Sequence, residues 1–140
     1  MTDIGTRLPD LARRITLTDM VAYAGATWDW HRMHYDQDYI REKHLPAPVV
    51  DGQVFGALLV EQLQDHFGPD AFVKELSFRF ANLVFAGESV RCESVVSAHD
   101  GDRIELDCRV VAIAADGQER AAVAPASAVV QLATAGAHDS

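Results

Sequence analysis

Apolar and polar residues alternate along four runs in the second half of the chain, at residues 72–82, 88–99, 103–114 and 119–132. Such alternation predicts β-strands with one face turned toward a core. Asp-Gly pairs separate the last three runs and favour tight hairpins, so we expect these three strands to form an antiparallel meander. Pro125 lies within the last run and has no backbone N–H to donate, which predicts an edge strand or a β-bulge there.

The first half of the chain has helical patterns instead. Residues 52–67 carry apolar side chains at helical spacing and are followed by a glycine, which predicts a long helix buried on most of its sides. Before it, we expect a strand over residues 13–18, a helix whose start is marked by Thr18, and a shorter helix after Asp36. These elements predict an α+β protein in which a curved antiparallel sheet wraps around a long central helix, with a helix-loop overhang before that helix. This is the outline of a hot-dog fold.

Composition and charge exclude several classes of function. The chain has 140 residues, 49% of them hydrophobic, which suits one domain over residues 1–140 with one core. A formal net charge of −9 argues against a nucleic-acid binder. No apolar run reaches the roughly 18 residues of a membrane span and no signal-like segment is present, so we expect no membrane association and a cytoplasmic location. Cys92 and Cys108 lie in strand-like runs and are expected to be buried free thiols.

The segment TWDWHRMHYD, residues 27–36, is dense in side chains that take part in chemistry. Asp29 and His34 are five residues apart, so a continuous helix would leave them about 140° apart and a strand would place them on opposite faces. Only a turn or a broken helix lets them converge on one water, which the carboxylate would orient while the imidazole exchanges its proton. Such a pair suits the addition of water to an activated double bond. The alternative is that Asp29 caps a turn and His34 packs beside Trp28.

Gly52 begins the predicted central helix, so its backbone N–H lies at the positive end of the helix dipole. A thioester carbonyl placed there would find a donor for the negative charge that develops in enolate-like chemistry. Glycine also allows a ligand to approach the backbone closely. The alternative is an ordinary helix start with Asp51 as N-cap.

The strings DWHRMH and VVDGQVFGALL resemble the hydratase motif of MaoC-like hot-dog proteins, the (R)-specific enoyl-CoA hydratases and 3-hydroxyacyl-thioester dehydratases. The resemblance extends from about Thr18 to Leu132. It implies that Asp29 and His34 are the catalytic acid/base pair and that Gly52 supplies the oxyanion-hole amide. The implied reaction is the syn hydration of a trans-2-enoyl thioester to the (R)-3-hydroxyacyl thioester, or its reverse. We expect no metal site, because the histidines lack a supporting ligand cluster, and no cofactor other than coenzyme A as part of the substrate.

The sequence departs from the family pattern at several positions. The family's usual Asn and Pro are His31 and Arg32 here, and its usual His before the helix glycine is Asp51. A carboxylate at Asp51 would oppose negative charge at the oxyanion site unless it turns away or caps the helix. The central helix lacks the small hydroxyl that is frequent in the family, and Gln53 is a candidate to replace its hydrogen bond. The candidates for lining the pocket are therefore His31, Asp51, Gln53 and Trp30.

The leading interpretation is a lyase, an enoyl-CoA hydratase or dehydratase of lipid metabolism. Arg79 and Arg91 are candidates for contacting the phosphates of coenzyme A, with exposed structural arginines as the alternative. Esters of coenzyme A are favoured over those of acidic carrier proteins, which this chain would repel. A hot-dog thioesterase that uses Glu61, and a non-catalytic or partner-dependent MaoC-like subunit of a heteromeric hydratase, remain open. The exposed edge of the predicted sheet favours a homodimer or higher homo-oligomer, or a heteromer with another MaoC-like chain.

Overall fold

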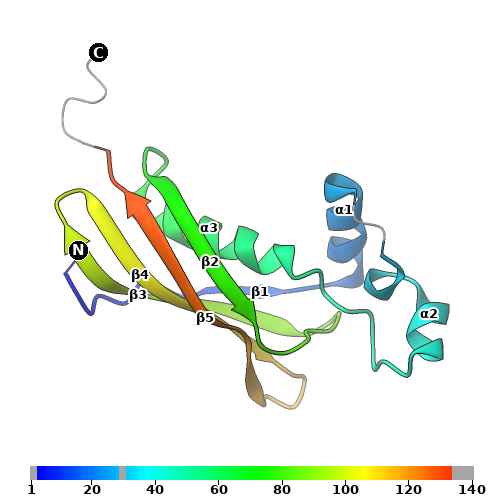
Figure 1. Ribbon diagram of the computed structural model, residues 1–140. Helices are drawn as coiled ribbons and strands as arrows, with labels where there is room; N and C mark the ends of the chain where they lie inside the picture. Colours follow the sequence, from blue (N-terminus) through cyan, green and yellow to red (C-terminus); the bar gives the residue numbers. More distant parts are fainter. Residues whose placement is uncertain (1–2, 29–30, 134–140) are drawn as a thin grey trace.

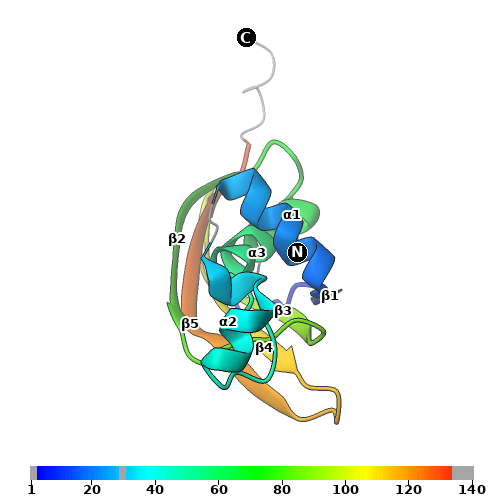
Figure 2. The ribbon, with the colours of Figure 1, turned by 90° about the vertical axis from the view of Figure 1, so that its right-hand side faces the viewer.

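The computed structural model describes residues 3–28 and 31–133 and contains one five-stranded antiparallel sheet (Figure 1). The strand order is β1-β3-β4-β5-β2. The strands are β1 (Leu11–Arg14), β2 (Phe72–Phe80), β3 (Ser89–Asp100), β4 (Arg103–Ile113) and β5 (Glu119–Gln131). The long helix α3 (Gln53–Phe67) lies along one face of the sheet, and Figure 2 shows that this face is concave. The predicted curved sheet around a central helix is therefore confirmed.

The three long strands β3, β4 and β5 form the predicted meander. β3 pairs with β4 and β4 with β5, both antiparallel, through hairpins at the two Asp-Gly turns. β5 lies between β4 and β2, so Pro125 is not on an edge strand. Both ladders of β5 shift register between Val123 and Ala126, which brackets the proline. Of the two predicted alternatives, an edge strand and a β-bulge, the structure has a break in the strand register at Pro125 and no strand edge.

The core lies between α3 and the concave face of the sheet. Leu59 and Leu63 of α3 are fully buried and belong to one apolar cluster with Val90, Cys92 and Val96 of β3. The exposed positions of α3 are Gln53, Ala57, Gln64 and Asp65, on the side away from the core, and its other eleven residues are buried or half-buried, in agreement with the expected helix buried on most of its sides. A helix with one buried and one wet face is the ordinary packing solution against a sheet.

A buried polar group ties α3 to the sheet. The Gln62 amide donates to the carbonyl oxygens of Pro9 and Cys92, at 2.9 Å each, and accepts from the Ser94 hydroxyl at 2.7 Å. Each polar atom of this side chain is therefore paired inside the core, as burial requires. The pairing fixes the position of α3 along β3 and above the segment before β1.

The N-terminal elements differ from the prediction in their boundaries. The strand β1 covers Leu11–Arg14 rather than residues 13–18, and helix α1 (Leu17–Thr27) begins after Thr16 rather than at Thr18. The Thr16 hydroxyl accepts from the Asp19 N–H at 3.1 Å, and the Asp19 carboxylate accepts from the Thr16 N–H at 3.0 Å. This reciprocal capping box satisfies two backbone donors at once and therefore fixes the helix start.

The overhang before the central helix is also present. A 3₁₀ turn, η1 (Arg32–His34), and a short helix, α2 (Gln37–Glu42), follow α1. Asp36 caps α2 as expected, since its carboxylate accepts from the N–H groups of Asp38 and Tyr39. Figure 1 shows α1 and α2 together beyond the N-terminal end of α3. This arrangement brings η1 to the start of α3.

Cys92 and Cys108 are free and buried, which confirms the prediction for both. Burial raises the pKa of the Cys92 thiol to about 12, and it raises the pKa of Cys108 as well. Within the described residues, none of the helices is both long enough and apolar enough to cross a bilayer.

Candidate active site

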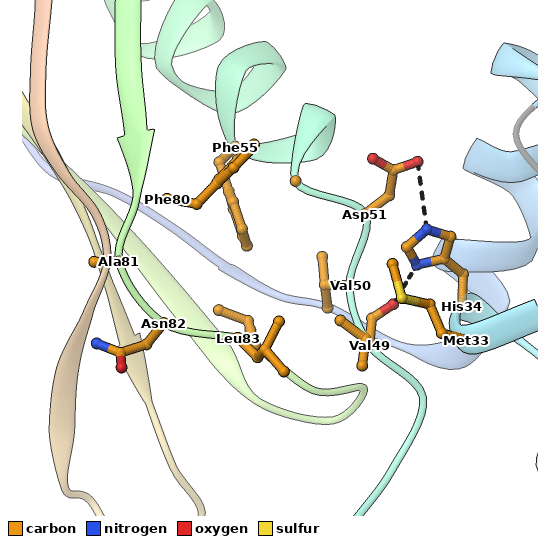
Figure 3. A pocket seen from close by; sticks show the side chains of 12 residues that line it. Met33, His34, Val49, Val50, Asp51, Phe55, Phe80, Ala81, Asn82 and Leu83 are labelled. Atoms are coloured by element: carbon orange, nitrogen blue, oxygen red, sulfur yellow. Dashed lines mark hydrogen bonds and ion pairs between the residues drawn. The ribbon is translucent and has the colours of Figure 1, made fainter. Parts of the chain in front are cut away.

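A cavity of about 400 Å³ lies where the start of α3, the turn η1 and the segment after β2 meet (Figure 3). Its walls are mainly apolar, and its polar side chains are those of His34, Asp51 and Asn82. The remaining residues that line it are Met33, Val49, Val50, Gly52, Phe55, Phe80, Ala81, Leu83 and Val84. Concave apolar pockets with a few convergent polar groups are the usual form of small-molecule sites.

The imidazole of His34 is held rigidly at one wall of this cavity. The side chain is buried, and its Nδ1 lies 2.6 Å from the carbonyl oxygen of Val49. Because a carbonyl oxygen can only accept, Nδ1 carries the proton of the neutral ring. The backbone N–H of Val49 in turn donates to the carbonyl of Met33 at 2.7 Å, so η1 and the strand-like segment before α3 are fastened together. Nε2 is therefore the ring nitrogen that does not carry a proton in the neutral ring.

Asp51 lies opposite Nε2 of His34. One carboxylate oxygen, Oδ1, accepts from the Gln53 N–H at 3.0 Å, and the other, Oδ2, is 3.9 Å from His34 Nε2. The dashed line in Figure 3 shows this second oxygen directed at the imidazole. Asp51 thus both caps the start of α3 and presents a carboxylate to the cavity.

Gly52 forms the floor of the cavity at the start of α3. It is the N-cap residue of the helix, and no hydrogen bond of its backbone N–H is present within residues 3–28 and 31–133. The Phe80 ring packs against its Cα, so that a Cβ at this position would lie 2.5 Å from Phe80 Cζ. The glycine is therefore required for the close approach of the aromatic ring, and its N–H lies at the positive end of the helix dipole.

Two of the residues predicted for the site, Asp29 and Trp30, lie outside the described residues. The structure brings His34, Asp51 and Gly52 together around the cavity. Their common location agrees with the predicted arrangement, whereas the assigned role of each residue in catalysis stays a prediction.

His31 and Gln53, two of the candidates for lining the pocket, are exposed and are not among the residues that line this cavity. The Nδ1 of His31 accepts from the Met33 N–H at 3.1 Å and so caps η1, and its ring makes an edge contact with His34. Gln53 is the first residue of α3 and its side chain points away from the buried face. The backbone N–H of Gln53 donates to Oδ1 of Asp51, which caps the start of α3.

Arg91, a candidate for contacting coenzyme A, has its charge already compensated by two carboxylates. It lies on β3 between the buried residues Val90 and Cys92, so its side chain is on the convex face of the sheet, away from α3. There it donates to Glu93 at 2.7 Å and to Glu119 at 2.8 Å. Arg79 is exposed on β2 and does not line the cavity either. Neither arginine faces the pocket.

Sequence reasoning missed two parts of the site. The first is the carbonyl of Val49, which fixes the tautomer of His34; a backbone atom leaves no signal in residue types. The second is the wall formed by residues 80–84 after β2, in which the Asn82 amide donates to the carbonyl of Ala121 at 2.8 Å. An aromatic residue and an asparagine at the end of an alternating run are the signal that could have pointed to it.

Comparison with known proteins places this chain in a family. A family model described as MaoC like domain matches residues 3–116. The peroxisomal hydratase-dehydrogenase-epimerase of Saccharomyces cerevisiae is 27% identical over 89 residues, which cover 63% of this chain and 10% of that protein. This chain therefore corresponds to about a tenth of the length of that curated relative.

Solved structures share the fold over nearly the whole chain. The (R)-hydratase from A. caviae involved in PHA biosynthesis superposes with a TM-score of 0.83 at 24% identity, covering 94% of this chain and 97% of that one. The R-hydratase PhaJ1 from Pseudomonas aeruginosa gives 0.85 at 19% identity, covering 95% and 83%. The ChsH1-ChsH2 complex from Mycobacterium tuberculosis gives 0.81 at 25% identity, covering 95% and 100%. Since the family model spans most of the chain and the fold agrees, this chain belongs to the MaoC-like domain family.

Proposed function

We propose that this protein catalyses the reversible syn hydration of trans-2-enoyl-CoA to (R)-3-hydroxyacyl-CoA. The observation that carries the proposal is the position of His34, whose buried imidazole lines an apolar cavity that has Gly52 at its floor. Membership of the MaoC-like family and the (R)-hydratases among its structural neighbours support the same reaction class.

The reaction uses the groups around the cavity as follows. His34 Nε2 takes one proton from a water molecule while the water oxygen forms a bond to C3 of the enoyl chain. The electron pair of the C2=C3 double bond moves toward the thioester carbonyl, whose oxygen accepts a hydrogen bond from the Gly52 N–H. The proton on Nε2 then passes to C2 on the same face. The product is the 3-hydroxyacyl thioester, and the imidazole returns to its neutral form.

Asp29 has the proposed role of orienting the water, as the family motif implies. It is five residues before His34; α1 ends at Thr27 and η1 begins at Arg32, so no described helix extends over both positions. Coenzyme A is proposed as the carrier of the acyl group, because a chain of charge −9 repels acidic carrier proteins.

A partner-dependent subunit of a heteromeric hydratase is the second candidate, because His31, Arg32 and Asp51 depart from the family motif. The exposed edge of the sheet is a surface on which another chain can pack. Phe72 and Phe80 at the two ends of edge strand β2, and Leu83 just beyond it, are 65%, 56% and 54% exposed. Unpaired edges with apolar side chains usually pair with another chain. We propose that a second copy covers this edge; a related chain is the alternative, since the ChsH1-ChsH2 structure is a complex of two named components.

A thioesterase is less well supported. The carboxylate that this reading needs, Glu61, is paired with Arg13 and does not line the cavity. Such a reading also leaves the predicted pair of Asp29 and His34 without a purpose.

The proposal is tested by incubating the purified protein with crotonyl-CoA and longer trans-2-enoyl-CoAs and following the loss of enoyl absorbance. We expect turnover, and we expect His34→Ala and Asp29→Asn to lower kcat by about 10²- to 10⁴-fold. His99→Ala is the matched control, because His99 is exposed on β3 and should leave kcat unchanged. Absence of turnover across the series from folded protein would overturn autonomous activity and favour the partner-dependent subunit.

A further inference from the structure

His31 is an exposed residue that the reaction described above does not use, although it lies at the start of the turn η1, which carries His34. It is the N-cap residue of η1, and its Nδ1 accepts from the Met33 N–H at 3.1 Å. The backbone carbonyl of His31 accepts from the His34 N–H, also at 3.1 Å. Both the side chain and the backbone of His31 therefore close the turn from which the His34 imidazole projects.

Three hydrogen bonds connect the side chain of His31 to that of His34. The His34 Nδ1–H donates to the carbonyl of Val49 at 2.6 Å, a bond that Figure 3 shows. The Val49 N–H donates to the carbonyl of Met33 at 2.7 Å, and the Met33 N–H donates to His31 Nδ1. A displacement of Met33 would therefore move Val49 and, with it, the carbonyl that orients the imidazole.

The turn η1 depends on such bonds because it is only three residues long. The hydrogen bonds of a 3₁₀ turn have poorer geometry than those of an α-helix, and the first N–H groups of a helix have no partner within it. In η1 the imidazole of His31 accepts from one of these N–H groups. The same ring makes edge contacts with His34 and with Tyr39 of α2, at 5.9 and 5.7 Å between ring centroids. His31 thus lies between α2 and the turn that carries His34.

We propose that His31 is a positioning residue of the active site, which holds His34 in place through the hydrogen bond that its Nδ1 accepts from Met33. The inference rests on the proposed function, in which His34 exchanges the proton of water. A misplacement of about 1 Å at a catalytic group lowers the rate by up to about a hundredfold. Because His31 does not line the cavity, its loss should change kcat rather than the binding of substrate.

Three variants separate the two ring nitrogens of His31. Asparagine places its Oδ1 where the imidazole has Nδ1 and can accept from the Met33 N–H, whereas glutamine places its amide where the imidazole has Nε2. His31→Ala removes both groups. For crotonyl-CoA hydration we expect His31→Ala and His31→Gln to lower kcat by about ten- to a hundredfold and to change KM by less than about twofold. His31→Asn should restore most of the wild-type kcat.

The position of His34 can also be followed without substrate, by NMR of protein labelled with 15N-histidine. The proton on His34 Nδ1 should give a separate downfield signal, because burial and the bond to Val49 slow its exchange with water. His34→Ala identifies this signal by its absence. We expect the signal to persist in His31→Asn and to broaden or disappear in His31→Ala and His31→Gln.

The two measurements distinguish a failure of the inference from a failure of the proposed function. A wild-type kcat or an unchanged His34 signal in His31→Gln would overturn the inference alone. A His31→Asn variant as impaired as His31→Ala would also overturn it, since the acceptor at Nδ1 would then not be the group that matters. Wild-type protein without turnover of any enoyl-CoA would overturn the proposed function, and the His34 signal would still decide whether His31 holds the imidazole.

Discussion

Position 52 requires glycine because the Phe80 ring packs against it, and not because of its backbone angles. Its φ of −60° is open to any residue, but a Cβ would lie 2.5 Å from Phe80 Cζ. Phe80 is 56% exposed, so its ring can move aside at moderate cost. The glycine and the ring therefore act as a pair at the floor of the cavity.

We expect Gly52→Ala to destabilise the protein by about 1–2 kcal/mol, as overpacking does, and to lower kcat/KM by moving Phe80 into the cavity. Urea unfolding and initial rates measure the two effects. In the double variant Gly52→Ala with Phe80→Ala the steric clash is absent, so most of the stability should return. A double variant as unstable as the sum of the single variants would contradict the proposed contact.

Residue types predicted some of the site and not the rest, for physical reasons. His34 and Gly52 could be found because an imidazole near a helix-opening glycine is a recognisable combination of side chain and backbone. The orientation of Asp51 could not be found, since a carboxylate before a helix caps it in either case and the direction of its second oxygen depends on where η1 packs. The Val49 carbonyl belongs to the backbone and has no residue signal.

Among the elements, the start of α1 is the boundary that the sequence analysis placed wrongly. The β-branched residues of the segment favoured a strand through Thr18, but Thr16 and Asp19 have the spacing of a capping box, and that interaction decides the boundary. Hydrogen bonds from the Thr16 backbone N–H, and then from its side chain, lower the pKa of Asp19. The long strands were predicted within one or two residues because alternation persists over more than ten positions in β3, β4 and β5.

The chain contains a matched pair of threonines that tests this boundary. We expect Thr16→Ala to reduce the free energy of unfolding by about 1 kcal/mol, because the cap of α1 is lost. Thr18→Ala, at an exposed position inside the first turn, should change it by less than about 0.5 kcal/mol. Urea denaturation of both variants gives the comparison, and equal losses would argue against the Thr16 cap.

For the molecule as a whole, the two faces of the sheet have separate roles. The concave face carries the core and the cavity, while the convex face carries a charge network in which Glu93 contacts Arg7, Arg91 and Arg109. Burial by itself would raise the pKa of Glu93, but hydrogen bonds from Arg91 and Arg109 hold it below its usual value. Alternation along β3 already places Arg91 on the outer face beside buried neighbours, so this placement could have been read from the sequence.

The buried thiols predict that the folded protein loses stability at alkaline pH. The pKa of Cys92 is raised to about 12 in the folded state, whereas an unfolded thiol ionises near pH 8.5. Below about pH 8.5 the thiol is protonated in both states and takes no stability from the folded state. Stability is lost as the pH rises from there, by about 2 kcal/mol between about pH 8.5 and about pH 10 for this thiol alone. Chemical denaturation across this range measures the slope, and Cys92→Ala should flatten it. A wild-type profile as flat as that of the variant would contradict the assignment.

The face from which hydrogen and hydroxyl reach the double bond tests the central claim most directly. We would run the hydration of crotonyl-CoA in D2O and determine the configuration at C2 and C3 of the product. A single water held at His34 Nε2 predicts (R)-3-hydroxybutyryl-CoA with deuterium added at C2 syn to the hydroxyl, and a kcat about 10²- to 10⁴-fold lower for His34→Ala. An (S) product, anti addition, or equal turnover by that variant would contradict the proposed site.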